Sequence, residues 1–76
     1  MMQVTERALF SRIDRALRRE DPLQRLRKMR GEAAIRELGW ICIWDYSMNI
    51  PMSWHLDLET LGRDLGVLRP DETVIE

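Results

Sequence analysis

The sequence lacks the cross-links that often hold small proteins together. Its 76 residues include a single cysteine, Cys42, which excludes an internal disulfide and suits a reducing compartment. Asp45, His55 and Asp57 are of metal-ligating types, but they lack the CxxC or i, i+4 spacing of known sites. We therefore expect no metal site and no cofactor, and a chain that gains its stability from packing alone.

Long hydrophobic runs are also missing. No stretch approaches the roughly 18 apolar residues of a membrane span. The start, MMQVTERALFSR, meets an acidic residue at Glu6, which is untypical of a secretory signal. These absences predict a soluble, cytoplasmic protein that does not engage a membrane. The four glycines stand apart from one another, so no glycine-rich phosphate loop is present either.

The chain is short as well. A domain of this size buries only about 60 to 65% of the surface that its unfolded chain exposes, so a monomer is marginally stable. Without a disulfide or a metal, pairing with a second copy is the usual remedy. We expect one domain over residues 1–76, and a homodimer.

Charge is abundant and unevenly distributed. Charged residues make up 33% of the chain, and the net charge of -1 hides a division between its two parts. Residues 1–31 carry a net charge of +5, and residues 32–76 carry -6. This division indicates either an anionic partner or contact between the basic end and the acidic end of another copy.

The first half of the chain predicts helices. Leu9, Ile13 and Leu17 recur at helical spacing after Thr5, which can cap the helix, and Pro22 ends it near residue 20. Because proline also suits the first position of a helix, we predict a second helix over residues 22–30. A further helical stretch is expected over residues 32–38.

The second half predicts a β-hairpin followed by a helix. Residues 40–46 and 50–56 show strand periodicity, with a turn over residues 47–49 in which Asn49 adopts the left-handed conformation. The predicted register pairs residues 40, 42 and 44 with residues 56, 54 and 52. A last helix begins after Asp57 and stops at Gly66. Residues 70–76 are expected to form a flexible tail, with a short strand from TVIE as the alternative.

All three tryptophans lie in the hairpin. Helices with apolar stripes need an apolar sheet face, and burying aromatic side chains stabilises strongly, so we interpret Trp44 and Trp54 as core. Trp40 is expected near the edge. The other face then exposes aliphatic side chains beside an edge strand, which predicts a dimer interface. The candidate interface residues are Ile41, Ile43 and Pro51. The alternative is that residues 22–38 fold over this face.

Taken together, these patterns predict an α+β fold of order α-α-β-β-α, with an antiparallel hairpin packed on helices.

Residues 37–68, ELGWICIWDYSMNIPMSWHLDLETLGRDLGVL, resemble a group of short bacterial proteins of unknown function, some carried on mobile elements. The resemblance rests on Leu38-Gly39, on Asp45 and Asn49 around the turn, and on HLDLETLGRDLGVL. It implies a bacterial origin and one compact domain, and it transfers no active site.

We expect no enzymatic activity, because the only nucleophile and base of suitable types, Cys42 and His55, fall on opposite faces of the predicted hairpin. The first functional hypothesis is a regulatory or accessory module that acts by protein–protein interaction as a homodimer. The alternative is a nucleic-acid-binding regulator, because arginine side chains match phosphate geometry. Its candidate contact residues are Arg15, Arg18, Arg19, Arg25, Arg27, Lys28 and Arg30.

Overall fold

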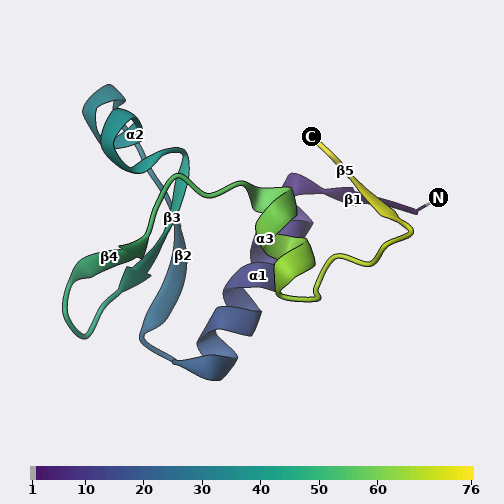
Figure 1. The fold of residues 1–76 in the computed structure, drawn as a ribbon, viewed down its shortest axis with the longest axis horizontal. Coiled ribbons are helices and arrows are strands. Elements are labelled where there is room, and N and C mark those ends of the chain that lie inside the picture. Colours follow the sequence, from purple (N-terminus) through teal and green to yellow (C-terminus); the bar gives the residue numbers. More distant parts are fainter. Residues whose placement is uncertain (1) are drawn as a thin grey trace.

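A computed structural model describes residues 2–76 and contains three helices and five strands (Figure 1). In chain order these are β1 Met2–Thr5, α1 Glu6–Glu20, β2 Gln24–Lys28, α2 Glu32–Leu38, β3 Ile41–Asp45, β4 Ile50–Ser53, α3 Leu58–Asp64 and β5 Glu72–Ile75. The fold is a small mixed α and β domain with an antiparallel sheet. The predicted element order is wrong, because β1 and β2 were not foreseen and β5 was only the alternative to a flexible tail.

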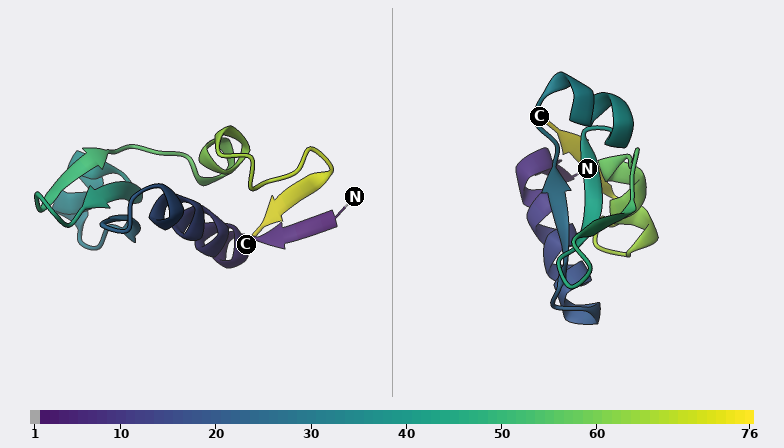
Figure 2. Two further views of the ribbon diagram at one scale, coloured as in Figure 1. Left: turned by 90° about the horizontal axis from the view of Figure 1, so that it is seen from below. Right: turned by 90° about the vertical axis from the view of Figure 1, so that its left-hand side faces the viewer.

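The strands form two separate sheets. Strands β2, β3 and β4 form an antiparallel sheet in that order, and β1 pairs in parallel with β5. The molecule is elongated, about 39 by 29 by 16 Å. The three-stranded sheet and α2 occupy one end, while α1, α3 and the β1–β5 pair occupy the other (Figures 1 and 2).

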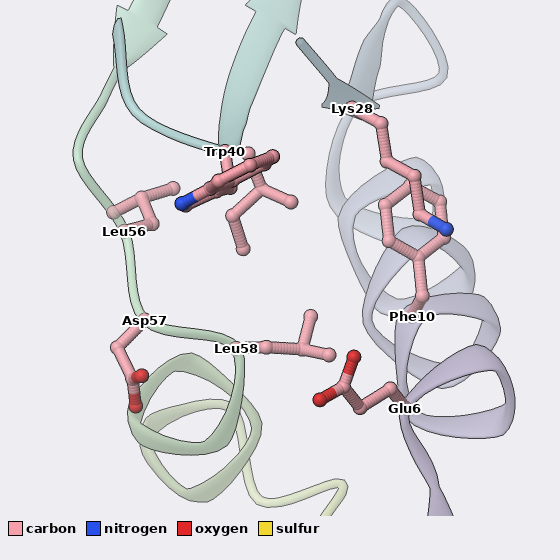
Figure 3. Close-up of a pocket in the computed structure, with 8 residues that line it drawn as sticks. Glu6, Phe10, Lys28, Trp40, Leu56, Asp57 and Leu58 are labelled. Carbon is pink, nitrogen blue, oxygen red and sulfur yellow. The ribbon is translucent and has the colours of Figure 1, made fainter. Parts of the chain in front are cut away.

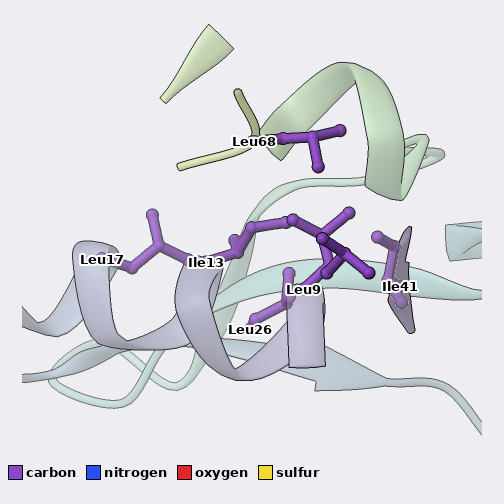
Figure 4. Packing of buried hydrophobic residues seen from close by; sticks show 7 residues of the cluster. Leu9, Ile13, Leu17, Leu26, Ile41 and Leu68 are labelled. Atoms are coloured by element: carbon purple, nitrogen blue, oxygen red, sulfur yellow. The ribbon is translucent and has the colours of Figure 1, made fainter. Parts of the chain in front are cut away.

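Helix α1 confirms the prediction made for the first segment. The Thr5 hydroxyl accepts a hydrogen bond from the Ala8 N–H, and the helix ends at Glu20. Its Leu9, Ile13 and Leu17 side chains are buried. Figure 4 shows them facing Leu68 after α3, with Leu26 of β2 and Ile41 of β3 beside them. The core therefore lies between α1, α3 and the β2–β3 part of the sheet.

The helix predicted over residues 22–30 is wrong, because most of this segment forms strand β2. Asp21 directs the chain out of α1: its carboxylate accepts from the Leu23 N–H, and its carbonyl from the Gln24 N–H. From there Leu26 pairs with Ile43 and is the one buried residue of β2. One inward residue in five gives no amphipathic helical stripe, so pairing with β3 decides the structure. The helix over residues 32–38 is confirmed as α2.

The hairpin is confirmed, with a changed register. Ile43 pairs with Ser53 as the predicted register requires, but the pairing then shifts by one, so that Trp44 faces Pro51 instead of Met52. Asn49 has a φ of 58°, which confirms the left-handed turn. The shift is an irregularity of the bulge type, in which one strand carries an extra residue.

The predicted assignment of the sheet faces is wrong. Ile41 is only 7% exposed, and Ile43 packs against the same core, so the isoleucines of β3 face α1. Because side chains alternate along a strand, Trp44 lies on the other face, where it is half-buried. Trp54 is 52% exposed and Trp40 is 72% exposed. The core is filled by aliphatic side chains, three of them from α1, and the tryptophans lie outside it.

Helix α3 begins as predicted, with the Asp57 carboxylate accepting from the Thr60 N–H. The chain then turns back, and the Val67 and Leu68 N–H groups both donate to the Gly62 carbonyl. This return buries Leu68 against α1. In place of the expected tail over residues 70–76, the structure has strand β5, which pairs with β1, so the two ends of the chain lie side by side (Figure 1).

Candidate functional site

The exposed hydrophobic side chains of the protein concentrate on the hairpin. Five of them, each between 42 and 58% exposed, fall within nine residues. We call this set the hairpin surface: Tyr46, Met48, Ile50, Met52 and Trp54. Clusters of this kind on a small protein mark a contact site more often than scattered single residues do.

The loop that carries part of the hairpin surface is held in one conformation by Asp45. The buried Asp45 carboxylate accepts hydrogen bonds from the Ser47 N–H, the Ser47 hydroxyl and the Met48 N–H. The bond from the Ser47 hydroxyl is the main reason that the pKa of Asp45 lies below its ordinary value, and the two N–H groups act in the same direction. The loop is therefore preformed, and ordering it for a contact would cost little conformational entropy.

Trp44 joins this loop to strand β2. Its indole N–H donates to the Asn49 side-chain oxygen at 3.3 Å, and its ring lies 6.5 Å from the Tyr46 ring, centroid to centroid. The Arg27 guanidinium lies 4.6 Å from the Trp44 ring centroid. The outer face of the sheet therefore presents an aromatic ring with a cation stacked on it.

The two edges of the three-stranded sheet carry features that oppose strand pairing. Edge strand β2 carries Arg25, Arg27 and Lys28, while edge strand β4 contains Pro51, which has no N–H, and the register shift.

The predicted dimer interface must also be corrected. Ile41 and Ile43 lie in the core of the single chain beneath α1, and residues 22–38 do not provide that cover. Pro51 is half-buried on β4.

The seven basic residues predicted to contact nucleic acid do not form one surface. Arg25 donates to both carboxylate oxygens of Asp14, and Arg18 lies 3.5 Å from the same carboxylate. Arg27 stacks on Trp44, and the Lys28 ammonium lies 5.4 Å from the Phe10 ring centroid. The exposed Arg30 lies just after β2, whereas Arg15 and Arg19 line a pocket to which no residue of β2 contributes.

Two of these arginines, Arg18 and Arg25, are engaged by the carboxylate of Asp14. It is buried, and it also accepts from the Leu26 N–H at 3.0 Å. Burial raises the pKa of Asp14, but the hydrogen bonds from Arg25 and Leu26, together with the charges of Arg25 and Arg18, outweigh it and hold the pKa below its ordinary value. Arg25 and the Leu26 N–H therefore tie β2 to α1 through Asp14, while Arg18 pairs with Asp14 from within the same helix.

A pocket of about 440 Å³ lies between the start of β3 and the first turns of α1 and α3 (Figure 3). Trp40, Leu56 and Leu58 lie on one side of it, and Phe10 with Lys28 on the other. Its lining also includes the carboxylates of Glu6 and Asp57, and Asp57 is already engaged in capping α3. The pocket widens the exposed hydrophobic area around Trp40.

Cys42 and His55 occupy different environments. Cys42 is fully buried, with its Sγ 3.3 Å from Met29 Sδ, and burial raises the pKa of the thiol, which disfavours the reactive thiolate. His55 is exposed, and its backbone packs against Gly39, where an added Cβ would lie 2.9 Å from His55 Cα. Across residues 2–76, no three side chains of His, Cys, Asp or Glu gather as a metal site would require.

Sequence reasoning missed the exposure of the hairpin surface. The signal was nevertheless present, because residues 46–54 contain no charged residue in a chain that is 33% charged. A charge-free loop with Pro51 at a strand edge is more typical of a contact surface than of a core strand.

Within the described residues, no helix has the length and apolar character needed to cross a membrane.

Comparison of the chain with protein families, with curated proteins and with solved structures found no match.

Proposed function

We propose that this protein is a small, non-enzymatic regulatory or accessory module of the cytoplasm that acts through protein contacts, and that it forms a homodimer through the hairpin surface. The observation that carries the proposal is the concentration of exposed hydrophobic side chains on a preformed, uncharged loop and strand. The resemblance of residues 37–68 to short bacterial proteins of unknown function, some carried on mobile elements, supports a bacterial origin.

The absence of charge on the hairpin surface favours a second copy as the partner. In a two-fold dimer the same patch meets itself, so a charged patch would place like charges together. Residues 46–54 impose no such repulsion. The composition also fits, because Tyr, Trp and Met are enriched at protein interfaces.

The exposed area of the hairpin surface is of the order that a protein–protein interface needs. If each fully exposed side chain offers about 200 Å², the five side chains of the hairpin surface present about 500 Å² per copy. A standard interface buries about 800 Å² per partner. If the hairpin surfaces of two copies bury one another fully, they supply about 1,000 Å² in total, which is the lower bound for a specific interface.

Sedimentation velocity over a concentration series tests this proposal with the variants Trp54→Glu and Leu65→Glu. Leu65 is a matched control, because it is an exposed hydrophobic residue at the end of α3, outside the hairpin. We expect wild type and Leu65→Glu to reach twice the mass of the chain. Trp54→Glu should weaken the dimer by about 30-fold, which corresponds to about 2 kcal/mol for an interface tryptophan. A wild-type monomer at every concentration, or equal weakening by both variants, would overturn the proposal.

A second candidate function, contact with single-stranded nucleic acid, has one observation in its favour: Arg27 stacked on Trp44 on an outer sheet face. Aromatic rings beside cations on a sheet are typical of proteins that stack bases. An oligothymidine titration followed by tryptophan fluorescence tests it. Quenching that is reduced in Arg27→Gln and kept in Arg36→Gln, an exposed arginine on α2, would favour this function. Absence of quenching at low salt would remove it.

A further inference from the structure

A second pocket, of about 460 Å³, lies between α1 and the segment that leads from α3 to β5. No residue of the hairpin surface lines it. Its charged lining consists of four arginines and one carboxylate: Arg12, Arg15, Arg19, Arg69 and Glu72. The pocket therefore carries a net charge of +3 in a chain whose net charge is -1.

Helix α1 supplies three of these arginines on one face. Arg12, Arg15 and Arg19 are spaced by three and four residues, which makes their side chains neighbours on the helix surface. Arg12 is fixed in place, because its Nη1 donates to the Val67 carbonyl at 3.1 Å and to both carboxylate oxygens of Glu72 at 3.0 and 3.1 Å. Arg12 is therefore held at the pocket before any ligand binds.

The single carboxylate of the pocket is already fully used. Glu72 is 4% exposed, and besides Arg12 it accepts from the Arg69 N–H at 2.8 Å. Within residues 2–76, the guanidinium groups of Arg15, Arg19 and Arg69 form no ion pair and no hydrogen bond. They differ in this respect from Arg18 and Arg25, which share Asp14.

We propose that this pocket binds a phosphate group through Arg15, Arg19 and Arg69, beside Arg12. The planar fork of arginine donates two parallel hydrogen bonds to phosphate oxygens, and several arginines around one open pocket match the charge of that group. Like charges on one helix face repel, and a bound oxyanion removes this repulsion. The volume is within the range of pockets that hold small ligands. The site is separate from the hairpin surface, so it does not depend on the dimer.

Calorimetric titration of the full chain with inorganic phosphate and pyrophosphate tests this site, at an ionic strength held constant with chloride. The test variant is Arg15→Gln/Arg19→Gln. The control, Arg7→Gln/Arg36→Gln, removes the same charge from exposed helical positions outside the pocket. We expect the test variant to weaken binding at least about tenfold and the control to bind as wild type does. Arg69→Gln, in the loop before β5, provides a second variant that leaves α1 unchanged.

Two further titrations, with a single-stranded and a duplex oligonucleotide, identify the source of the phosphate. Binding of the free anions assigns the pocket to a small phosphorylated ligand. Binding of an oligonucleotide alone, with a salt slope smaller by about two in Arg15→Gln/Arg19→Gln, assigns it to backbone phosphates. The proposal is overturned if no phosphate ligand binds better than chloride does. It is also overturned if the test and control variants lose affinity equally.

Discussion

The two ends of this molecule use hydrophobic residues in opposite ways. At the helical end, Leu9 and Ile13 of α1 are fully buried. At the hairpin end, Met48, Met52 and Trp54 are about half exposed. All three tryptophans thus lie outside the buried cluster, whose members are aliphatic. The core holds α1, α3 and strands β2 and β3 together, and the hairpin leaves its hydrophobic side chains exposed, where we propose the dimer contact.

Among the substitutions that test this contrast, the largest loss of stability is expected in the core. Ile13→Ala removes a fully buried side chain between α1 and the sheet and should lower the free energy of unfolding by about 3 kcal/mol. Urea denaturation followed by circular dichroism measures it. A loss below about 1 kcal/mol would mean that the core is not where we place it.

Asp14 is expected to have the next largest effect. Asp14→Ala leaves the buried Leu26 N–H without an acceptor and Arg25 without its partner, and should cost about 2 kcal/mol in the free energy of unfolding. The control is Asp64→Ala on the exposed end of α3, which forms no ion pair among the described residues. Equal losses for the two variants would contradict the structural role of Asp14.

Lowering the pH should destabilise the protein through protonation of Asp14. The pKa of Asp14 in the folded chain lies below its ordinary value of about 3.9, so its stabilisation is complete above that pH and disappears as the pH falls through the folded-state pKa. The pKa values of Asp45, Asp57 and Glu72 are shifted in the same direction. Urea midpoints measured from about pH 6 down to about pH 2.5 should fall with acid, less steeply in Asp14→Ala. A midpoint that does not depend on pH would exclude this contribution.

Gly62 offers a smaller test of the packing between α1 and α3. Glycine to alanine inside a helix normally stabilises by about 0.5 to 1 kcal/mol. Here the added Cβ would lie 2.8 Å from Leu9 Cδ1 and 3.3 Å from Leu68 Cβ, and Leu9 is fully buried. We expect Gly62→Ala to destabilise by about 1 kcal/mol, measured as a lower urea midpoint. A higher midpoint would show that the helices are not in close contact.

The smallest effect is expected on the hairpin surface. Met52→Ser should change the free energy of unfolding of the monomer by less than about 0.5 kcal/mol, because the side chain is 42% exposed. Thermal melts at high dilution, where the monomer dominates, measure it. A loss comparable with that of Ile13→Ala would place Met52 in the core and remove the contrast between the two ends.

Features determined by local sequence were predictable. Thr5 and Asp57 cap helices because their side chains reach N–H groups three residues away, and Asn49 adopts a left-handed turn that few residues tolerate. The apolar stripe of α1 identified one side of the core correctly. These elements depend on neighbours within a few residues, so the sequence pattern was sufficient.

Features determined by contacts between distant segments were not predictable. Strand β3 is apolar on both faces, so alternation alone did not show whether Ile43 or Trp44 faces the core, and the site was misplaced as a result. Strand β2 is fixed by pairing with β3, and β5 by pairing with the other end of the chain. The wrong choice of face also led to the prediction of Ile41 and Ile43, which are core residues, as dimer contacts.

A dilution series of amide nitrogen–proton NMR spectra tests the separation of the two ends most directly, because it reports on every residue of the unmodified chain. We expect concentration-dependent shifts to concentrate in residues 46–54 and the amides of α1 to remain unchanged. Shifts confined to α1, or no shift anywhere up to millimolar concentration, would contradict the assignment of the hairpin surface as the contact site.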